Sequence, residues 1–359
     1  IENTVDTRFR IGSVTKQFTG MAILRLHEEG ALDVDDLICD YLDDCPDHWQ
    51  QITIYQLLTH TSGIPNYTSF PDFLDVMVQN SESDDFVAYF HDEPLDFEVA
   101  EFLYMKRQIL DLAFSLDQAA FSAQAIQQIS SYRLIGLSDA YTIQKASLDN
   151  RYGRGEKLVG YKLGFTSRAK MEQMGVHDLI WGRLTDQMHI ANGGTLNRTD
   201  FIHPRVEPEI AFLIGKRIER KIRLQEAASF LKGVAGALEV IDSRYENFKF
   251  SLEDVIADNC SSAAFVIGDW LSPDVSVKDL SIEVYINEEK SQTGNSNAIL
   301  GNPMESLVEI SRILSEQDIA LEVGTVVLAG AATSAVHIHT GDKIEGQFGQ
   351  LGTVRLNVK

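Results

Sequence analysis

The chain has 359 residues, enough for two domains with sizeable cores, and its 44% hydrophobic and 23% charged residues are ordinary for a soluble protein. Its net charge of −22 argues against nucleic-acid binding, because no basic patch is available to contact the phosphates. No apolar run reaches the length of a membrane span and no signal peptide is recognisable, so we expect a cytoplasmic protein that does not enter a membrane.

The negative charge is unevenly distributed along the chain. Residues 1–104 hold 4 Lys/Arg against 21 Asp/Glu, a net of −17, whereas residues 105–359 hold 27 against 32, a net of −5. So sharp a change predicts two unlike modules that meet between residues 104 and 105. The sequence begins at Ile1, and we interpret Met105 as an original start. The first module is then a truncated one, joined to the second by natural fusion or by an assembly accident.

The three cysteines give little indication of covalent structure. Cys39, Cys45 and Cys260 form no metal-ligand pattern and leave an odd thiol, so the sequence predicts no disulfide framework.

The first module opens with a serine and a lysine at helical spacing. Ser13 and Lys16 are three residues apart, one helical turn, so the amine can lie beside the hydroxyl and accept its proton. An amphipathic helix should follow and end at Gly30. Thr53 and Gln56 have the spacing of a capping box for a helix over residues 54–58.

These motifs resemble the serine beta-lactamase and penicillin-binding protein family. The resemblance rests on Ser-Val-Thr-Lys at residues 13–16 and on Leu-Leu-Thr-His-Thr-Ser-Gly-Ile-Pro-Asn-Tyr at 57–67, and it covers nearly all of residues 1–104. It implies a mainly helical partial domain that exposes apolar surface, because half of the parent core is missing. The family also needs a Tyr-x-Asn motif, but the run ending at Tyr104 continues into Met105 without the asparagine. We therefore interpret Ser13 and Lys16 as a vestigial nucleophile pair.

Three patterns further along mimic parts of that family's machinery. They are Tyr245–Asn247, His339–Gly341 and a second Ser-x-x-Lys at Ser167–Lys170. All three lie in stretches that the second module explains better.

The second module should be α+β, with a helical N-terminal part and a mixed, β-rich core. Helices are expected at 105–130, from Leu137 with Ser138 as its N-cap, at 224–237 and at 302–314. Apolar–polar alternation between glycines predicts strands in the C-terminal part, residues 324–358. No nucleotide-binding glycine motif is present.

One predicted strand carries a lysine between two glycines. In residues 158–165, Gly160, Lys162 and Gly164 share one face, and the other is formed by Val159, Tyr161, Leu163 and Phe165. Open space beside the amine would suit contact with an anionic ligand, and an exposed lysine on an edge strand fits the pattern equally well.

A pair of glutamates marks the candidate site. Glu207 and Glu209 alternate in a predicted strand, so their carboxylates project from the same face, and Glu239 lies in another short apolar strand. Three carboxylates in one cavity would suit a hard divalent cation such as Mg²⁺. On spacing alone, the solvent-exposed face of an antiparallel strand explains the pair more simply.

Three motifs in order resemble the fumarylacetoacetate hydrolase superfamily, and within it the hydratase/decarboxylase branch. They are residues 160–167, 203–212 and 239–250, and the resemblance covers essentially all of 105–359. It implies Mg²⁺ or Mn²⁺ on Glu207, Glu209 and Glu239. The catalytic residues that it implies are Lys162 and Asp186, and the substrate-pocket residues are Thr166, Ser262 and Thr333.

The resemblance leads to a hypothesis about function. We expect metal-dependent decarboxylation of 4-oxalocrotonate (2-oxohex-3-enedioate) to 2-hydroxypenta-2,4-dienoate in catechol meta-cleavage, with the metal as a Lewis acid. The alternatives are 2-hydroxypenta-2,4-dienoate hydratase, a non-catalytic assembly subunit and, less favoured, a serine hydrolase built on residues 1–104. A homo-oligomer and a complex with the pathway's hydratase are the expected assemblies.

Overall fold

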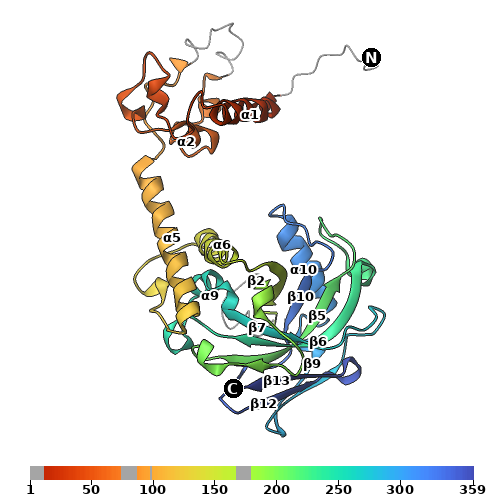
Figure 1. The fold of residues 1–359 in the computed structure, drawn as a ribbon. Coiled ribbons are helices and arrows are strands. Elements are labelled where there is room, and N and C mark those ends of the chain that lie inside the picture. Colours follow the sequence, from red (N-terminus) through yellow and green to blue (C-terminus); the bar gives the residue numbers. More distant parts are fainter. Residues whose placement is uncertain (1–11, 74–86, 98, 167–178) are drawn as a thin grey trace, which may run out of the picture. The chain divides into compact units, whose positions relative to one another are not determined.

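The computed structural model describes residues 12–73, 87–97, 99–166 and 179–359, and Ser167 and Lys170 lie outside them. The chain divides into two compact units, Ile1–Gln108 and Ile109–Lys359 (Figure 1). One helix, α5 (Val99–Ser122), runs across the boundary expected between residues 104 and 105, which stays a prediction. Within the described ranges, none of the helices combines the length and apolarity needed to cross a bilayer.

The first unit is mainly helical and has a small core. In its described part the α-helices are α1 (Thr15–Glu28) and α2 (Ile54–Leu58), and the cluster of buried apolar side chains consists of Ile38, Trp49 and Ile52. Helix α1 has no buried residue; Phe18 is 67% exposed and Met21 68%. The exposed apolar surface expected of a partial domain is therefore present on this unit.

The capping box at the start of α2 is confirmed. The backbone N–H of Gln56 donates to Thr53 Oγ1 at 3.3 Å, and the backbone N–H of Thr53 donates to Gln56 Oε1 at 2.7 Å. These two bonds satisfy donors at the helix start that no intrahelical carbonyl can reach.

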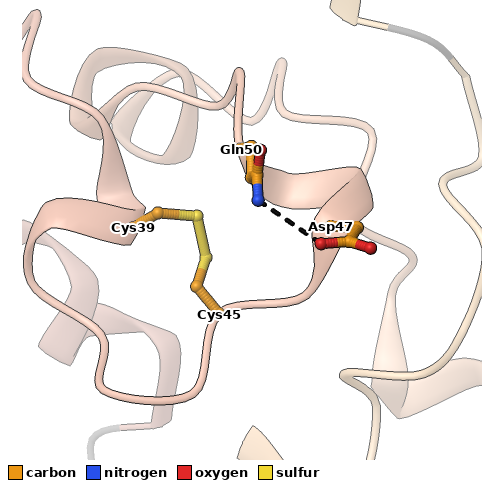
Figure 2. Close-up of a disulfide and its surroundings, with 4 residues drawn as sticks. All are labelled: Cys39, Cys45, Asp47 and Gln50. Atoms are coloured by element: carbon orange, nitrogen blue, oxygen red, sulfur yellow. Dashed lines mark hydrogen bonds between the residues drawn. A yellow bond between two sulfur atoms is a disulfide. The ribbon is translucent and has the colours of Figure 1, made fainter.

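The expectation of no disulfide is wrong for this unit. Cys39 and Cys45 are joined by a disulfide with a Cα–Cα separation of 5.3 Å, beside the hydrogen-bonded pair Asp47 and Gln50 (Figure 2). An odd number of cysteines does not exclude a disulfide here, because the third cysteine, Cys260, is buried in the other unit and does not take part. Disulfides are typical of oxidising compartments, so the cytoplasmic location remains a prediction.

Removing this disulfide should loosen the first unit. Replacing Cys39 and Cys45 by serine opens a short loop and should cost about 2 kcal/mol by the chain-entropy relation. We expect faster amide hydrogen exchange around Trp49 in the full-length protein, and the same change when dithiothreitol is added to the wild type. Dithiothreitol should have no further effect on the double variant. Equal exchange in all four samples would contradict a formed disulfide.

The second unit is built on two sheets (Figure 1). Among the described residues, the larger has the order β2-β1-β10-β5-β6-β7-β3, with β11 paired to β5, and the smaller has the order β4-β13-β12-β8-β9. The strands are β1 (Leu158–Gly164), β2 (Ile180–Thr185), β3 (His189–Ile190), β4 (Thr195–Leu196), β5 (Arg205–Ile214), β6 (Leu231–Ile241), β7 (Ser262–Ile267), β8 (Ser281–Ile286), β9 (Glu289–Asn295), β10 (Val326–Ala331), β11 (Val336–His337), β12 (Lys343–Gln347) and β13 (Thr353–Val358).

Helices accompany these sheets, as the α+β prediction requires. Besides α5, the described helices of this unit are α6 (Leu137–Gly153), α8 (Leu224–Ala227), α9 (Leu252–Ala257) and α10 (Met304–Ser315). The predicted strands of the C-terminal part are confirmed as β10, β12 and β13.

Side-chain alternation in β5 and β6 separates the core from the site. Even-numbered residues, such as Phe212 and Val240, join a large apolar cluster with residues of the smaller sheet, such as Ile344 and Leu356. Odd-numbered residues project from the opposite face, because successive side chains in a strand alternate. The three glutamates are all odd-numbered and belong to that second face.

Two local expectations are wrong. The helix predicted over residues 224–237 is only the short α8, after which the chain becomes the central strand β6. Gly233 and Gly236 weaken a helix there, and the strand is stabilised by pairing with β5 and β7 on both sides. The N-cap of α6 is Gly136 rather than Ser138, and the Gly136 N–H donates to the Asp139 carboxylate at 3.4 Å.

Candidate metal centre

The register of two strands brings the three predicted glutamates together. Glu207 of β5 lies directly opposite Glu239 of β6, and Glu209 follows two residues along β5 on the same face. Each offers a carboxylate oxygen within 4.8 Å of the others. Glu207 is 8% exposed, and Glu209 and Glu239 are fully buried. The solvent-face alternative is therefore wrong, because this face of the sheet is covered.

Fixed donors orient the two deepest carboxylates. The backbone N–H of Gly330 donates to Glu209 Oε2 at 2.7 Å, and the Ser262 hydroxyl donates to Glu239 Oε1 at 2.9 Å. Glu209 Oε1 is buried and has no hydrogen-bond partner in the described part of the chain. An oxygen without a partner, beside two further carboxylates, fits a hard cation that takes oxygen ligands.

Lys162 supplies the positive charge of the cluster. Its Nζ lies 3.0 Å from Glu239 Oε2 and donates to the Cys260 carbonyl at 3.4 Å, and the residue is 4% exposed. Burial alone would lower the pKa of Lys162, but the charges of Glu239, Glu207 and Glu209 outweigh burial and raise it above its ordinary value. The neighbouring glutamates therefore favour the protonated, positively charged form of the amine.

The space expected beside Lys162 is filled by neighbouring strands. A Cβ at Gly160 would lie 2.3 Å from the Val326 carbonyl oxygen of β10, and a Cβ at Gly164 would lie 2.7 Å from Ile180 Cγ1 of β2. The flanking glycines therefore let the strands pack closely. The alternative of an exposed lysine on an edge strand is wrong, because Lys162 is buried and β1 lies between β2 and β10. Contact of its amine with an anionic ligand stays a prediction.

Repulsion among the carboxylates is not fully relieved by the lysine. Burial, followed by the charge of Glu239, raises the pKa of Glu209 well above its ordinary range, and Lys162 opposes this only in part. In the absence of a metal the cluster therefore tends to retain a proton.

A cavity of about 320 Å³ opens beside the cluster. Glu207 and Lys162 line it, whereas Glu209 and Glu239 lie deeper. Its wall combines aromatic and aliphatic side chains with polar groups: Leu163, Gly164, Phe165, Thr166, Ile180, Arg205, Ile241, Phe248, Phe250, Val255, Cys260, Ser261, Ala331, Ser334 and Ala335. A cavity with apolar walls and a few convergent polar groups is typical of small-molecule sites.

The three predicted pocket residues have different positions. Thr166 lines the cavity and packs against Gly330, where an added Cβ would lie 2.1 Å from its hydroxyl; Gly330 also has a φ of +108°. Ser262 is outside the cavity wall, and its hydroxyl orients the Glu239 carboxylate by donating to Oε1. Thr333 is outside the wall, and its hydroxyl donates to the Ser334 carbonyl at 3.1 Å.

Asp186 does not join the cluster. It follows the end of β2, where its carboxylate accepts a hydrogen bond from the Lys157 N–H at 2.9 Å, and it lines a different cavity of about 410 Å³. The β1–β2 register pairs Lys162 with Gly182, four residues before Asp186, a separation of about 13 Å along the strand. Asp186 therefore lies apart from the glutamates and Lys162, and its catalytic role stays a prediction.

Ser13 and Lys16 lie together in the first unit. Lys16 Nζ is 3.4 Å from Ser13 Oγ, and both side chains are exposed. A catalytic pair would be set in a cavity with donors for a developing negative charge. None of the described cavities includes Ser13 or Lys16.

Arg205 and Ser261 are among the polar residues of the cavity wall that sequence reasoning did not single out. Arg205 begins β5 and shares the odd-numbered alternation of Glu207 and Glu209, a signal that was present in the motif. Ser261 precedes the predicted Ser262, and its position depends on the turn at residues 259–261, which the sequence pattern does not reveal.

Comparisons with known proteins agree with this architecture. Residues 170–359 match the family model described as fumarylacetoacetate (FAA) hydrolase C-terminal, and residues 1–101 match the beta-lactamase family model. The chain is 45% identical over 247 residues to a 4-oxalocrotonate decarboxylase of a Pseudomonas species, covering 69% of this chain and 96% of that relative. It is 31% identical to a 2-keto-4-pentenoate hydratase of Paraburkholderia xenovorans, covering 68% and 93%.

A solved structure gives the same assignment. The 4-oxalocrotonate decarboxylase from Pseudomonas putida G7, complexed with magnesium and adipate, is 33% identical, with a TM-score of 0.68 over 71% of this chain and 98% of that one. The N-terminal segment is thus beta-lactamase-like, and the chain belongs to the fumarylacetoacetate hydrolase family.

Proposed function

We propose that this protein is a lyase that decarboxylates 4-oxalocrotonate to 2-hydroxypenta-2,4-dienoate with the help of a divalent metal. The observation that carries the proposal is the buried cluster of Glu207, Glu209 and Glu239 with Lys162 at the wall of a cavity. The similarity to 4-oxalocrotonate decarboxylases over nearly their whole length supports this substrate.

The glutamates are the residues that would hold the metal. Glu209 has a buried oxygen without a hydrogen-bond partner in the described ranges. Each of the three glutamates offers a carboxylate oxygen within 4.8 Å of the others. Mg²⁺ and Mn²⁺ both accept such oxygen ligands. When bound, the cation supplies Lewis-acid stabilisation of negative charge on the 2-oxygen of the substrate.

The reaction itself needs only charge stabilisation and one proton. The bond between C5 and C6 breaks, and its electron pair moves through the alkene to the 2-oxygen, which then takes a proton to give the dienol. The Lys162 ammonium lies within the cluster and favours negative charge beside it. The aromatic rings of Phe165, Phe248 and Phe250 suit the hydrocarbon middle of the substrate and limit access of water.

A substrate test separates decarboxylation from hydration. With Mg²⁺ present, the purified protein should release CO₂ from 4-oxalocrotonate and leave 2-hydroxypenta-2,4-dienoate unhydrated. Both ultraviolet bands and the CO₂ would be followed in parallel. Consumption of the dienoate without CO₂ would establish the hydratase instead, which the hydratase relatives favour as the second candidate. Absence of activity on both substrates would contradict both the decarboxylase and the hydratase proposals.

Assembly into a homo-oligomer, a complex with the pathway's hydratase, a cytoplasmic location and a module boundary at residues 104/105 all remain predictions. So do the catalytic roles of Lys162 and Asp186 and the substrate contacts of Thr166, Ser262 and Thr333.

A further inference from the structure

Arg205 extends the row of charged side chains on β5. It is the first residue of the strand, two positions before Glu207 and four before Glu209, so all three share one face. Its cross-strand partner is Ile241, which also lines the cavity. The site therefore runs along the strand from the glutamates to an arginine about 7 Å away from Glu207 at the Cα.

The guanidinium of Arg205 is held in place but not neutralised. It lies over the Phe248 ring with Cζ 3.9 Å from the centroid, and its Nε is buried with no hydrogen-bond partner among the described residues. Within the same ranges, no carboxylate lies at ion-pair distance from it, whereas the buried Arg244 pairs with Asp258 and Lys162 with Glu239. An unsatisfied donor of this kind is costly unless a ligand completes it.

A second unsatisfied donor faces the same cavity. Ser261 is 3% exposed, and its hydroxyl has no hydrogen-bond partner in the described ranges. It ends a run of three residues with left-handed φ values, Asn259 at 50°, Cys260 at 52° and Ser261 at 58°. Such backbone is unfavourable for residues with a Cβ, and residues in strained conformations cluster at active sites and ligand clamps.

The sheet places these two donors on the same side of the glutamates. Ile241 pairs with Arg205 on one side and with Ser262, the neighbour of Ser261, on the other. Two strand spacings, about 10 Å between backbones, therefore separate Arg205 from this turn. The long arginine side chain can share a ligand group with a hydroxyl across that distance.

We propose that Arg205, assisted by Ser261, binds the remote carboxylate of a dicarboxylic substrate whose other end is held at the three glutamates. This inference rests on the proposed function and deepens it by naming the residues that select a dicarboxylate. The two carboxyl carbons of an extended six-carbon diacid are roughly 6 Å apart, which matches the spacing along β5. A guanidinium stacked on an aromatic ring keeps its N–H edge free for a forked bond to a carboxylate.

The assignment has a consequence for the kinetics. The remote carboxylate loses its charge as CO₂ departs, so its contact with Arg205 weakens on the way to the transition state. Arg205 therefore contributes to binding and selectivity rather than to the rate of the bound substrate. The Arg205→Met variant should raise KM by about 10- to 100-fold, the range expected for a charged hydrogen bond, with kcat unchanged or higher.

The decisive experiment is a binding comparison that needs no turnover. Isothermal titration in Mg²⁺ would measure 2-oxoadipate, a dicarboxylate, against 2-oxohexanoate, which lacks the remote carboxylate, on the wild type, Arg205→Met and Arg205→Lys. We expect Arg205→Met to lose 10- to 100-fold in affinity for 2-oxoadipate and none for 2-oxohexanoate, with Arg205→Lys in between. The matched control is Arg220→Met, because Arg220 also lies over a ring, Phe230, outside this cavity.

Two outcomes would overturn the inference. One is a wild type that binds both ligands equally, and the other is an Arg205→Met variant that loses both ligands to the same extent. Failure of the proposed function has a different signature, namely no CO₂ from 4-oxalocrotonate although 2-oxoadipate binds and depends on Arg205. Arg205→Lys keeps the test decisive if Arg205→Met does not fold.

Discussion

Replacing Glu239 by glutamine is expected to weaken Mg²⁺ binding by more than about 100-fold and to abolish CO₂ release from 4-oxalocrotonate. Loss of groups that merely support a metal ligand costs about 10- to 100-fold, so loss of a ligand itself should exceed that range. Glutamine keeps the shape of the side chain and can still accept the Ser262 hydrogen bond, but it removes the charge. The protein should remain folded, because one source of repulsion among the buried carboxylates disappears.

Thermal unfolding tests the loss of Mg²⁺ binding without any substrate. Mg²⁺ at about 100 times the wild-type Kd should stabilise the wild type by about 2.7 kcal/mol and Glu239→Gln by less than about 0.4 kcal/mol. The matched control is Glu289→Gln, an exposed glutamate of β9, which should respond to Mg²⁺ like the wild type. An unaltered Mg²⁺ response in Glu239→Gln would remove Glu239 from the metal site.

Proton release gives the same prediction a second readout. The raised pKa of Glu209 means that the metal-free cluster retains a proton at a pH where an ordinary glutamate is ionised. Metal binding must displace that proton, so Mg²⁺ affinity should rise with pH and fall as the pH is lowered. Titration in buffers of different ionisation enthalpy would count the protons released. No release and a flat pH profile would show that Glu209 is already ionised.

Most of what the sequence predicts about the site comes from the alternation of side chains between the two faces of a strand. Glu207 and Glu209 on one face, with Glu239 in a neighbouring strand, follow from the period of a strand. The sequence pattern does not contain the register that sets Glu239 opposite Glu207, nor the burial of the sheet's second face. Those depend on long-range pairing, and for that reason the residues alone favoured a solvent-exposed pair.

The expectations that were wrong depended on contacts far apart in sequence. The sequence predicts a helix over residues 224–237, yet pairing with β5 and β7 on both sides makes residues 231–237 part of strand β6. The sequence suggests that Gly160 and Gly164 leave space for a ligand, but Val326 and Ile180 of the neighbouring strands fill that space. The Cys39–Cys45 disulfide is not predicted, because an odd number of cysteines says nothing about whether the loop between these two brings their sulfur atoms together.

Lys162→Met should lower kcat by about 100- to 1,000-fold while it tightens Mg²⁺ binding. The loss of rate is that expected for removing one fixed charge that stabilises negative charge in the transition state. The gain in metal affinity follows from Coulomb's law, because the Lys162 ammonium lies 3.0 Å from Glu239 and both repels the cation and competes for that carboxylate. Metal affinity and activity should therefore change in opposite directions.

Measurements of unfolding stability distinguish a role of Lys162 in catalysis from a purely structural role. In the metal-free protein, Lys162→Met leaves buried carboxylates without a counter-charge, which should cost about 3–5 kcal/mol by urea unfolding in the presence of a chelator. Saturating Mg²⁺ should restore that stability but not kcat. If kcat recovers with stability, Lys162 only neutralises the cluster. Lys157→Met, an exposed lysine just before β1, is the matched control and should leave kcat, Mg²⁺ affinity and stability unchanged.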